Sequence, residues 1–126
     1  MKVSKAIEIV NKIKPNAFPT AAKIRWLNHL EGRIAADVFL LAPAEIEALT
    51  LTEDSEDWEL LVKAPHDDVY TSWLRAQIDL ENGEYNKYQN TMQEFNACMD
   101  SFTAWFANLY EPAQGYLIPG PRTGGM

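Results

Sequence analysis

The chain has 126 residues, 47% of them hydrophobic, and a formal net charge of −7. This length fits one domain around one core, and the apolar content excludes a disordered chain. An acidic surface disfavours nonspecific nucleic-acid binding, because phosphate backbones repel it. Cys98 is the single cysteine, which fits a reducing compartment, and we interpret it as a small core residue rather than a nucleophile. With no apolar run near the length of a membrane span, we expect a cytoplasmic protein.

The charges are distributed unevenly along the chain. Residues 1–33 hold seven Lys and Arg against two Glu (+5), and residues 34–126 hold four basic against sixteen acidic residues (−12). A solvated surface with a chance asymmetry accounts for this pattern. The alternative is that copies of the chain meet head to tail, with Arg25 and Arg33 of one copy facing acidic residues of the next.

Helical periodicity predicts two helices in the first third of the chain. Ser4 would cap a short helix that ends before Pro15. Thr20 would cap a second helix whose apolar residues recur at helical spacing to about Ala42, and Pro43 would end it.

Residues 43–64 are less regular and contain an acidic cluster. We expect an extended, partly ordered connection in which LTLT and WELLV are possible short strands. A third helix would follow Pro65, with Asp67 and Asp68 at its positive end, and Asn82-Gly83 would end it.

The fourth predicted helix carries the strongest pattern in the sequence. Its apolar residues step by three and four, as in a heptad seam: Tyr85, Tyr88, Met92, Phe95, Met99, Phe102, Phe106 and Leu109. The seam fits the core of one chain, and the alternative is a helix that also packs on a neighbouring copy. Trp105 lies off the seam.

A tail rich in Gly and Pro follows Pro112, which should end the fourth helix. We therefore divide the chain into a single helical domain, residues 1–111, and a flexible tail, residues 112–126. A frayed terminus is one interpretation of the tail. The other is that Leu117 and Ile118 anchor it to a partner.

A search for catalytic or metal-binding patterns finds none that is specific. His66 with Asp67 and Asp68 resembles a helix cap more than a metal site. An all-α magnesium-dependent hydrolase would need several carboxylates on one face, whereas Asp79, Glu81 and Glu84 fit a solvated helix end. We expect no enzyme, no cofactor and no metal.

Two stretches, Lys23–Val38 and Leu60–Phe106, resemble the head–tail connector (adaptor) family of phages and prophages of Gram-positive bacteria. The residues that carry the resemblance are Arg25-Trp26-Leu27, Glu31-Gly32-Arg33-Ile34, Ala64-Pro65 followed by Asp67-Asp68 and Tyr70, Asp79-Leu80, Gly83-Glu84-Tyr85, Asn90 and Phe95-Asn96-Ala97. The resemblance spans residues 20–110 and rests on packing and turn residues.

The resemblance implies a structural virion-assembly protein that forms a homo-oligomeric ring below the portal and links head to tail. Its partners would be further copies, the portal protein, and tail or stopper proteins, with DNA passing through the ring without specific binding. It would occupy the host cytoplasm during assembly and then the virion. The alternative is a helical protein–protein interaction module that forms no ring.

These inferences give one structural hypothesis: an all-α domain of about four helices, with the third and fourth as a central antiparallel pair. The expected core residues are Trp26, Trp73, Phe95, Phe102 and Phe106. The candidate subunit contacts are Arg25, Arg33, Glu53, Asp54, Glu56 and Asp57, and the candidate tail anchor is Leu117 with Ile118.

Overall fold

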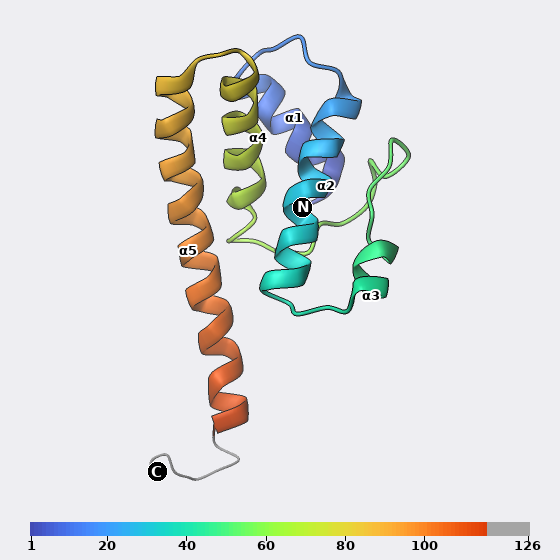
Figure 1. The fold of residues 1–126 in the computed structure, drawn as a ribbon, viewed down its shortest axis with the longest axis vertical. Coiled ribbons are helices and arrows are strands. Elements are labelled where there is room, and N and C mark those ends of the chain that lie inside the picture. The colour runs from blue at the N-terminus through green and yellow to red at the C-terminus, as the bar shows by residue number, and fades with distance from the viewer. Residues whose placement is uncertain (116–126) are drawn as a thin grey trace.

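A computed structural model describes the fold of residues 1–115 and the side chains as far as Leu109. Within these residues the protein is all-α, as predicted. The helices are α1 (Val3–Ile13), α2 (Thr20–Asp37), α3 (Pro43–Ala48), α4 (Asp68–Glu81) and α5 (Tyr85–Gly115) (Figure 1). Leu117 and Ile118, the predicted tail anchor, lie outside the described residues.

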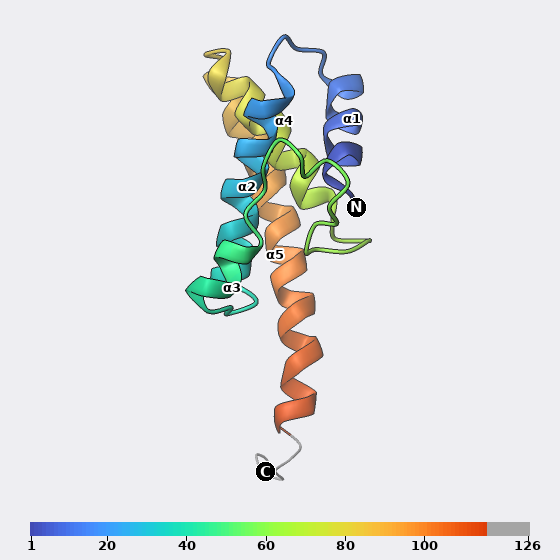
Figure 2. The same ribbon diagram turned by 90° about the vertical axis from the view of Figure 1, so that its right-hand side faces the viewer.

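Helices α4 and α5 form the most extensive helix pair and run antiparallel through the tight turn at Gly83 (Figure 1). Helices α1 and α2 pack on the other side of α4. The chain therefore forms a small bundle along α5, and the C-terminal end of α5 extends beyond this bundle (Figures 1 and 2). None of the described helices is both long and apolar enough to cross a membrane.

The core lies where α1, α2, α4 and the N-terminal and middle parts of α5 meet. Phe95 and Phe102 are buried in it, and Phe102 is only 1% exposed. Trp26, Trp73 and Phe106 are partly buried and pack against this core. The heptad seam of α5 is therefore buried in its middle, whereas Tyr85 and Leu109 at its two ends are exposed.

Several predicted boundaries were wrong by a few residues. Helix α2 ends at Asp37 rather than about Ala42: Phe39 packs on Phe106 of α5, and Leu40 adopts a left-handed conformation (φ 55°) that does not continue a helix. Helix α5 continues through Pro112 to Gly115. A proline removes one backbone hydrogen bond but keeps a φ angle that suits a helix. Ser4 and Thr20 are not N-caps, since α1 and α2 begin at Val3 and Thr20.

The connection from Leu49 to Asp67 is held to the bundle by hydrogen bonds at separated points. The possible strands at LTLT and WELLV are absent from it, and its one β-like pairing is an isolated antiparallel bridge between Lys2 and Glu59. The expected irregular connection also begins later than predicted, because Pro43–Ala48 form α3. The Val3 N–H donates to the carbonyl of Trp58, and the Leu60 N–H donates to that of Met1. The segment that follows is hydrogen-bonded to the buried side chains of Glu31 and Tyr70.

Candidate functional site

A buried polar pair joins α2, α4 and the long connection. The Tyr70 hydroxyl donates a hydrogen bond of 2.6 Å to Glu31 Oε1, and the Leu61 N–H donates to Glu31 Oε2 at 2.7 Å. The Tyr70 oxygen also accepts the Val62 N–H at 2.9 Å. Burial raises the pKa of Glu31, although these hydrogen bonds act in the opposite direction. Burial and the nearby Glu31 raise the pKa of Tyr70. Both Glu31 oxygens are occupied, so the pair anchors the connection.

A second buried polar group lies between α1, α4 and α5. Asp79 is fully buried and accepts hydrogen bonds from Lys14 Nζ at 2.5 Å and from Thr91 Oγ1 at 2.8 Å. This corrects our prediction that Asp79 belongs to a solvated helix end. The carboxylate ties three helices together, and both of its oxygens have protein partners. We therefore interpret it as structural.

The predicted subunit contacts are exposed but separate. Arg25 and Arg33 lie on the surface of α2, and Glu53, Asp54, Glu56 and Asp57 lie on the surface of the connection. Among the described residues, none of the ion pairs joins either arginine to this acidic cluster. The basic excess of residues 1–33 is smaller at the surface than the sequence suggests, because Lys14 and Lys23 make internal bonds, to Asp79 and to the Phe18 carbonyl.

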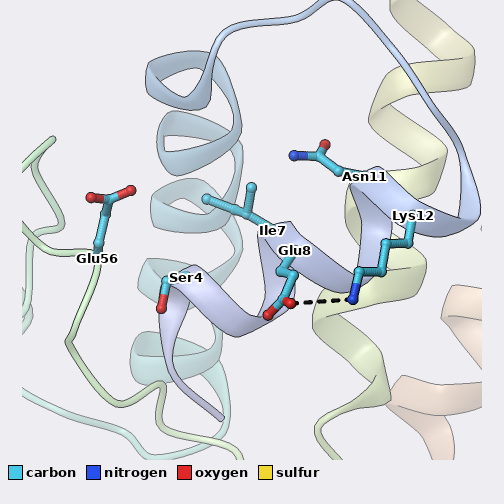
Figure 3. A pocket seen from close by; sticks show the side chains of 6 residues that line it. All are labelled: Ser4, Ile7, Glu8, Asn11, Lys12 and Glu56. Atoms are coloured by element: carbon cyan, nitrogen blue, oxygen red, sulfur yellow. Dashed lines mark ion pairs between the residues drawn. The ribbon is translucent and has the colours of Figure 1, made fainter.

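A polar hollow of about 370 Å³ lies between α1 and the connection (Figure 3). Ser4, Ile7, Glu8, Asn11, Lys12 and Glu56 line it. Glu8 forms ion pairs with Lys12 at 3.3 Å and with Lys5 at 3.6 Å. The hydrogen bond and charge of Lys12, with the charge of Lys5, lower the pKa of Glu8. The charges largely neutralise each other in a hollow open to solvent, so we assign it no chemistry.

Both histidines pack against aromatic rings. His29 stacks on Trp73 with ring centroids 6.2 Å apart, and His66 lies 5.0 Å from Trp105. Asp67 occupies the N-cap position of α4 but makes no capping hydrogen bond through its side chain. The prediction that His66, Asp67 and Asp68 form a helix cap is therefore wrong for the Asp67 side chain. In the part of the chain that the structure describes, no group of His, Cys, Asp and Glu is arranged to hold a metal ion.

An apolar groove lies between the second half of α2 and the middle of α5. It consists of two hollows, of about 320 Å³ and about 450 Å³, which share Asp37 and Val38. Their walls are mainly apolar: Leu30, Ile34, Val38, Phe39, Leu40, Trp73, Met92, Phe95, Met99, Phe106 and Ala107. We call this feature the α2–α5 groove. Arg33 and Asp37 supply charges at its edge.

The end of the groove nearest the C-terminus is built on an aromatic stack. Phe39 lies against Phe106 with ring centroids 5.0 Å apart, and Phe106 lies 5.8 Å from Phe102. Beyond this stack, no other helix of the described residues lies beside α5 (Figure 1). Trp105 and Leu109, near this end of the helix, are 46% and 56% exposed. Of the predicted contact residues, only Arg33 lines the groove.

Sequence reasoning missed the α2–α5 groove, although one signal for it was present. The seam on α5 is much longer than α4, so part of it had to face something else.

Comparison of the chain with protein-family models, with curated proteins and with solved structures gave no match.

Proposed function

We propose that the protein is a structural subunit of phage assembly: a head–tail connector that forms a ring below the portal and links the head to the tail. One observation carries the assembly role: α5 extends beyond the bundle (Figure 1), and the described residues leave an apolar groove open beside it. Apolar surface of this kind, edged by charged residues, is typical of protein–protein interaction sites.

The polar interior supports an architectural role. Glu31 and Asp79 are buried carboxylates, the kind of group that often acts in catalysis, and here the oxygens of each are bonded to neighbouring elements of the same chain. Their arrangement fixes helices and a long connection in place. The proposal accordingly includes no catalytic activity.

The charge of the protein is compatible with a channel for DNA. A net charge of −7 gives a surface that repels phosphate, so DNA would pass without being gripped. Closed rings need a heterologous interface, in which two different surfaces of each copy meet. Arg25 and Arg33 on α2 and the acidic cluster of residues 53–57 offer two such surfaces of opposite charge.

The specific assignment to phage rests on the resemblance of Lys23–Val38 and Leu60–Phe106 to connector proteins. In this fold several of the residues that carry the resemblance have structural roles: Glu31 and Tyr70 anchor the connection, and Asp79 joins three helices. Residues that stabilise a fold are expected to recur among proteins that share it. The partners we propose are further copies, the portal protein, and tail or stopper proteins.

Disruption of the gene in the phage that encodes it tests this function. We expect DNA-filled heads and free tails that fail to join, visible by electron microscopy, with restoration when the intact gene is supplied in trans. The protein should also be found in purified virions by mass spectrometry. Normal virions from the disrupted phage would contradict the proposal. The alternative, an interaction module without a ring, would leave heads and tails joined.

A further inference from the structure

We propose that the α2–α5 groove binds the tail segment Tyr116–Ile118 of a second copy of the chain. The inference rests on the proposed assembly function, of which it names one contact. The groove supplies a receptor whose walls are mostly apolar, and Tyr116-Leu117-Ile118 is an apolar tripeptide that directly follows the last residue of α5. Proteins commonly recognise peptides through pockets that accept the apolar side chains of the peptide.

The groove has the size and composition that such a segment requires. Its hollow nearest the C-terminus measures about 450 Å³ and is lined by Phe39, Leu40 and Phe106 with Ala107 at its end. Leu40 is 78% exposed, and its left-handed backbone holds it out from the end of α2. An exposed leucine in a conformation that is unfavourable for its residue type is consistent with a contact made only on assembly.

The reach of the chain indicates that the occupant comes from another copy. Ala107 and Gly115 are eight residues apart on α5, so the helix carries the chain about 12 Å beyond the groove before the tail begins. Reversal of a chain takes about four residues, which would return Ile118 only to the level of Gly115. The chain's own Leu117 and Ile118 therefore cannot enter the groove while α5 remains helical.

Charge adds a second argument for this occupant. Asp37 lines both hollows of the groove and is exposed, whereas Arg33 lines only the hollow farther from the C-terminus. Residues 116–126 contain one charged side chain, Arg122, and no acidic residue. At the hollow nearest the C-terminus, where Asp37 is the charged residue among the described residues of the wall, a tail with one positive charge is therefore favoured over a tail with a negative charge. Exchange of tails between successive copies is also a heterologous contact, of the kind that closes rings.

A peptide-binding experiment tests the receptor. The full chain with Leu117→Asp and Ile118→Asp has no competing tail and serves as the parent. A labelled peptide of residues 114–123 should bind it saturably, as measured by fluorescence anisotropy. Ala107→Trp, which fills the groove, should weaken binding at least tenfold. The matched control Ala104→Trp, at an exposed position of α5 outside the groove, should change binding less than twofold. Absence of saturable binding, or equal effects of the two substitutions, would overturn the proposal.

A cysteine-pairing experiment tests whether the contact joins two copies. In a Cys98→Ala background, Ala107→Cys and Leu117→Cys are placed in separate full chains that differ in mass, mixed and oxidised. We expect mixed disulfide dimers at least tenfold in excess over a mixture of Ala104→Cys with Leu117→Cys, because a disulfide needs Cα atoms within about 7 Å. A chain carrying Ala107→Cys and Leu117→Cys together should form few internal disulfides. Internal disulfides without mixed dimers would show that the tail binds its own groove, and would overturn the proposal.

The outcomes separate this inference from the proposed function. If the peptide and the cysteine pairs fail but the protein still joins heads to tails, the tail contact is wrong and the connector role stands. If tails are exchanged but heads and tails join without the protein, the contact stands and the connector role is wrong.

Discussion

The Tyr70 hydroxyl and the Glu31 carboxylate meet inside the core at 2.6 Å and hold the connection of residues 49–67 against α2 and α4. Each group also accepts a backbone N–H from this connection, at Val62 and Leu61. The connection contains no strand, so no neighbouring strand accepts hydrogen bonds from its buried N–H groups. The side chains of Glu31 and Tyr70 accept them instead.

Removal of the Tyr70 hydroxyl should therefore destabilise the protein beyond the loss of one bond. Tyr70→Phe leaves the Val62 N–H and one Glu31 oxygen without a partner in a buried site, which costs about 1–3 kcal/mol. The free energy of unfolding in urea measures this cost. Tyr85→Phe, on a side chain that is 63% exposed, is the control and should have little effect. Equal effects of the two substitutions would contradict the anchoring role.

The stability of the protein should depend on pH through Glu31 in an unusual direction. Burial raises the pKa of Glu31 above its ordinary value of 4.5, so the folded chain holds a proton that the unfolded chain has released. Between the two pKa values, stability contributed by this group falls as the pH rises. The free energy of unfolding of the wild type, relative to that of Glu31→Gln, should therefore decrease from about pH 4 towards neutrality.

Glu8 provides a control of opposite sign for this pH dependence. Lys12 and Lys5 lower the pKa of Glu8, so its contribution is present above the unfolded pKa and is lost as the pH falls. As the pH rises, the free energy of unfolding of the wild type should increase relative to that of Glu8→Gln. Over the same range it should decrease relative to that of Glu31→Gln. A flat or rising difference for Glu31→Gln in urea titrations across this range would refute the prediction.

Lys14 should matter far more to stability than its neighbour Lys12. Lys14→Met leaves the fully buried Asp79 with only Thr91 as a side-chain partner, and an uncompensated buried charge costs about 3 kcal/mol. Lys12→Met breaks an ion pair between two exposed side chains and should cost much less. Thermal and urea unfolding of the two variants test this. Comparable losses would show that the Lys14–Asp79 pair is not a structural tie.

The seam of α5 should contribute to stability unequally along its length. Phe102 is 1% exposed, so Phe102→Ala creates a cavity at a cost of about 3–5 kcal/mol. Trp105 is about half exposed on the same helix, so Trp105→Ala should lower the free energy of unfolding much less. The comparison is made by urea unfolding at constant pH. An unchanged melting temperature for Phe102→Ala would show that the seam is not part of the core.

Local patterns predicted the helical class and the α4–α5 pair, because periodicity and the Asn82-Gly83 turn depend on neighbours in the sequence. They failed where contacts between residues far apart in the sequence determine the structure. Glu31 and Asp79 are acidic residues with no local sign of burial, and their partners lie 39 and 65 residues away. The end of α2 was misplaced for a similar reason: the apolar residues after Asp37 continue the pattern, but Phe39 packs on Phe106 of α5.

The lengths of α4 and α5 indicate that part of the apolar seam of α5 lies beyond α4. Helix α4 has 14 residues and α5 has 31, so α5 is longer by about 25 Å at 1.5 Å per residue. A seam that outruns its partner must face another element, a second molecule or solvent. Periodicity shows that a face is apolar and does not show what covers it, so the choice between a core seam and a contact surface needed the fold.

The mass of the purified full chain, measured by light scattering alone and after mixing with the portal protein of the same phage, tests the connector role most directly. We predict a discrete complex whose mass exceeds that of the portal ring by a whole number of copies of the chain. If the proposed role holds, we expect the chain alone to be either a closed ring or a monomer that assembles on the portal. A monomer in both conditions, with the mass of the portal ring unchanged, would contradict the account.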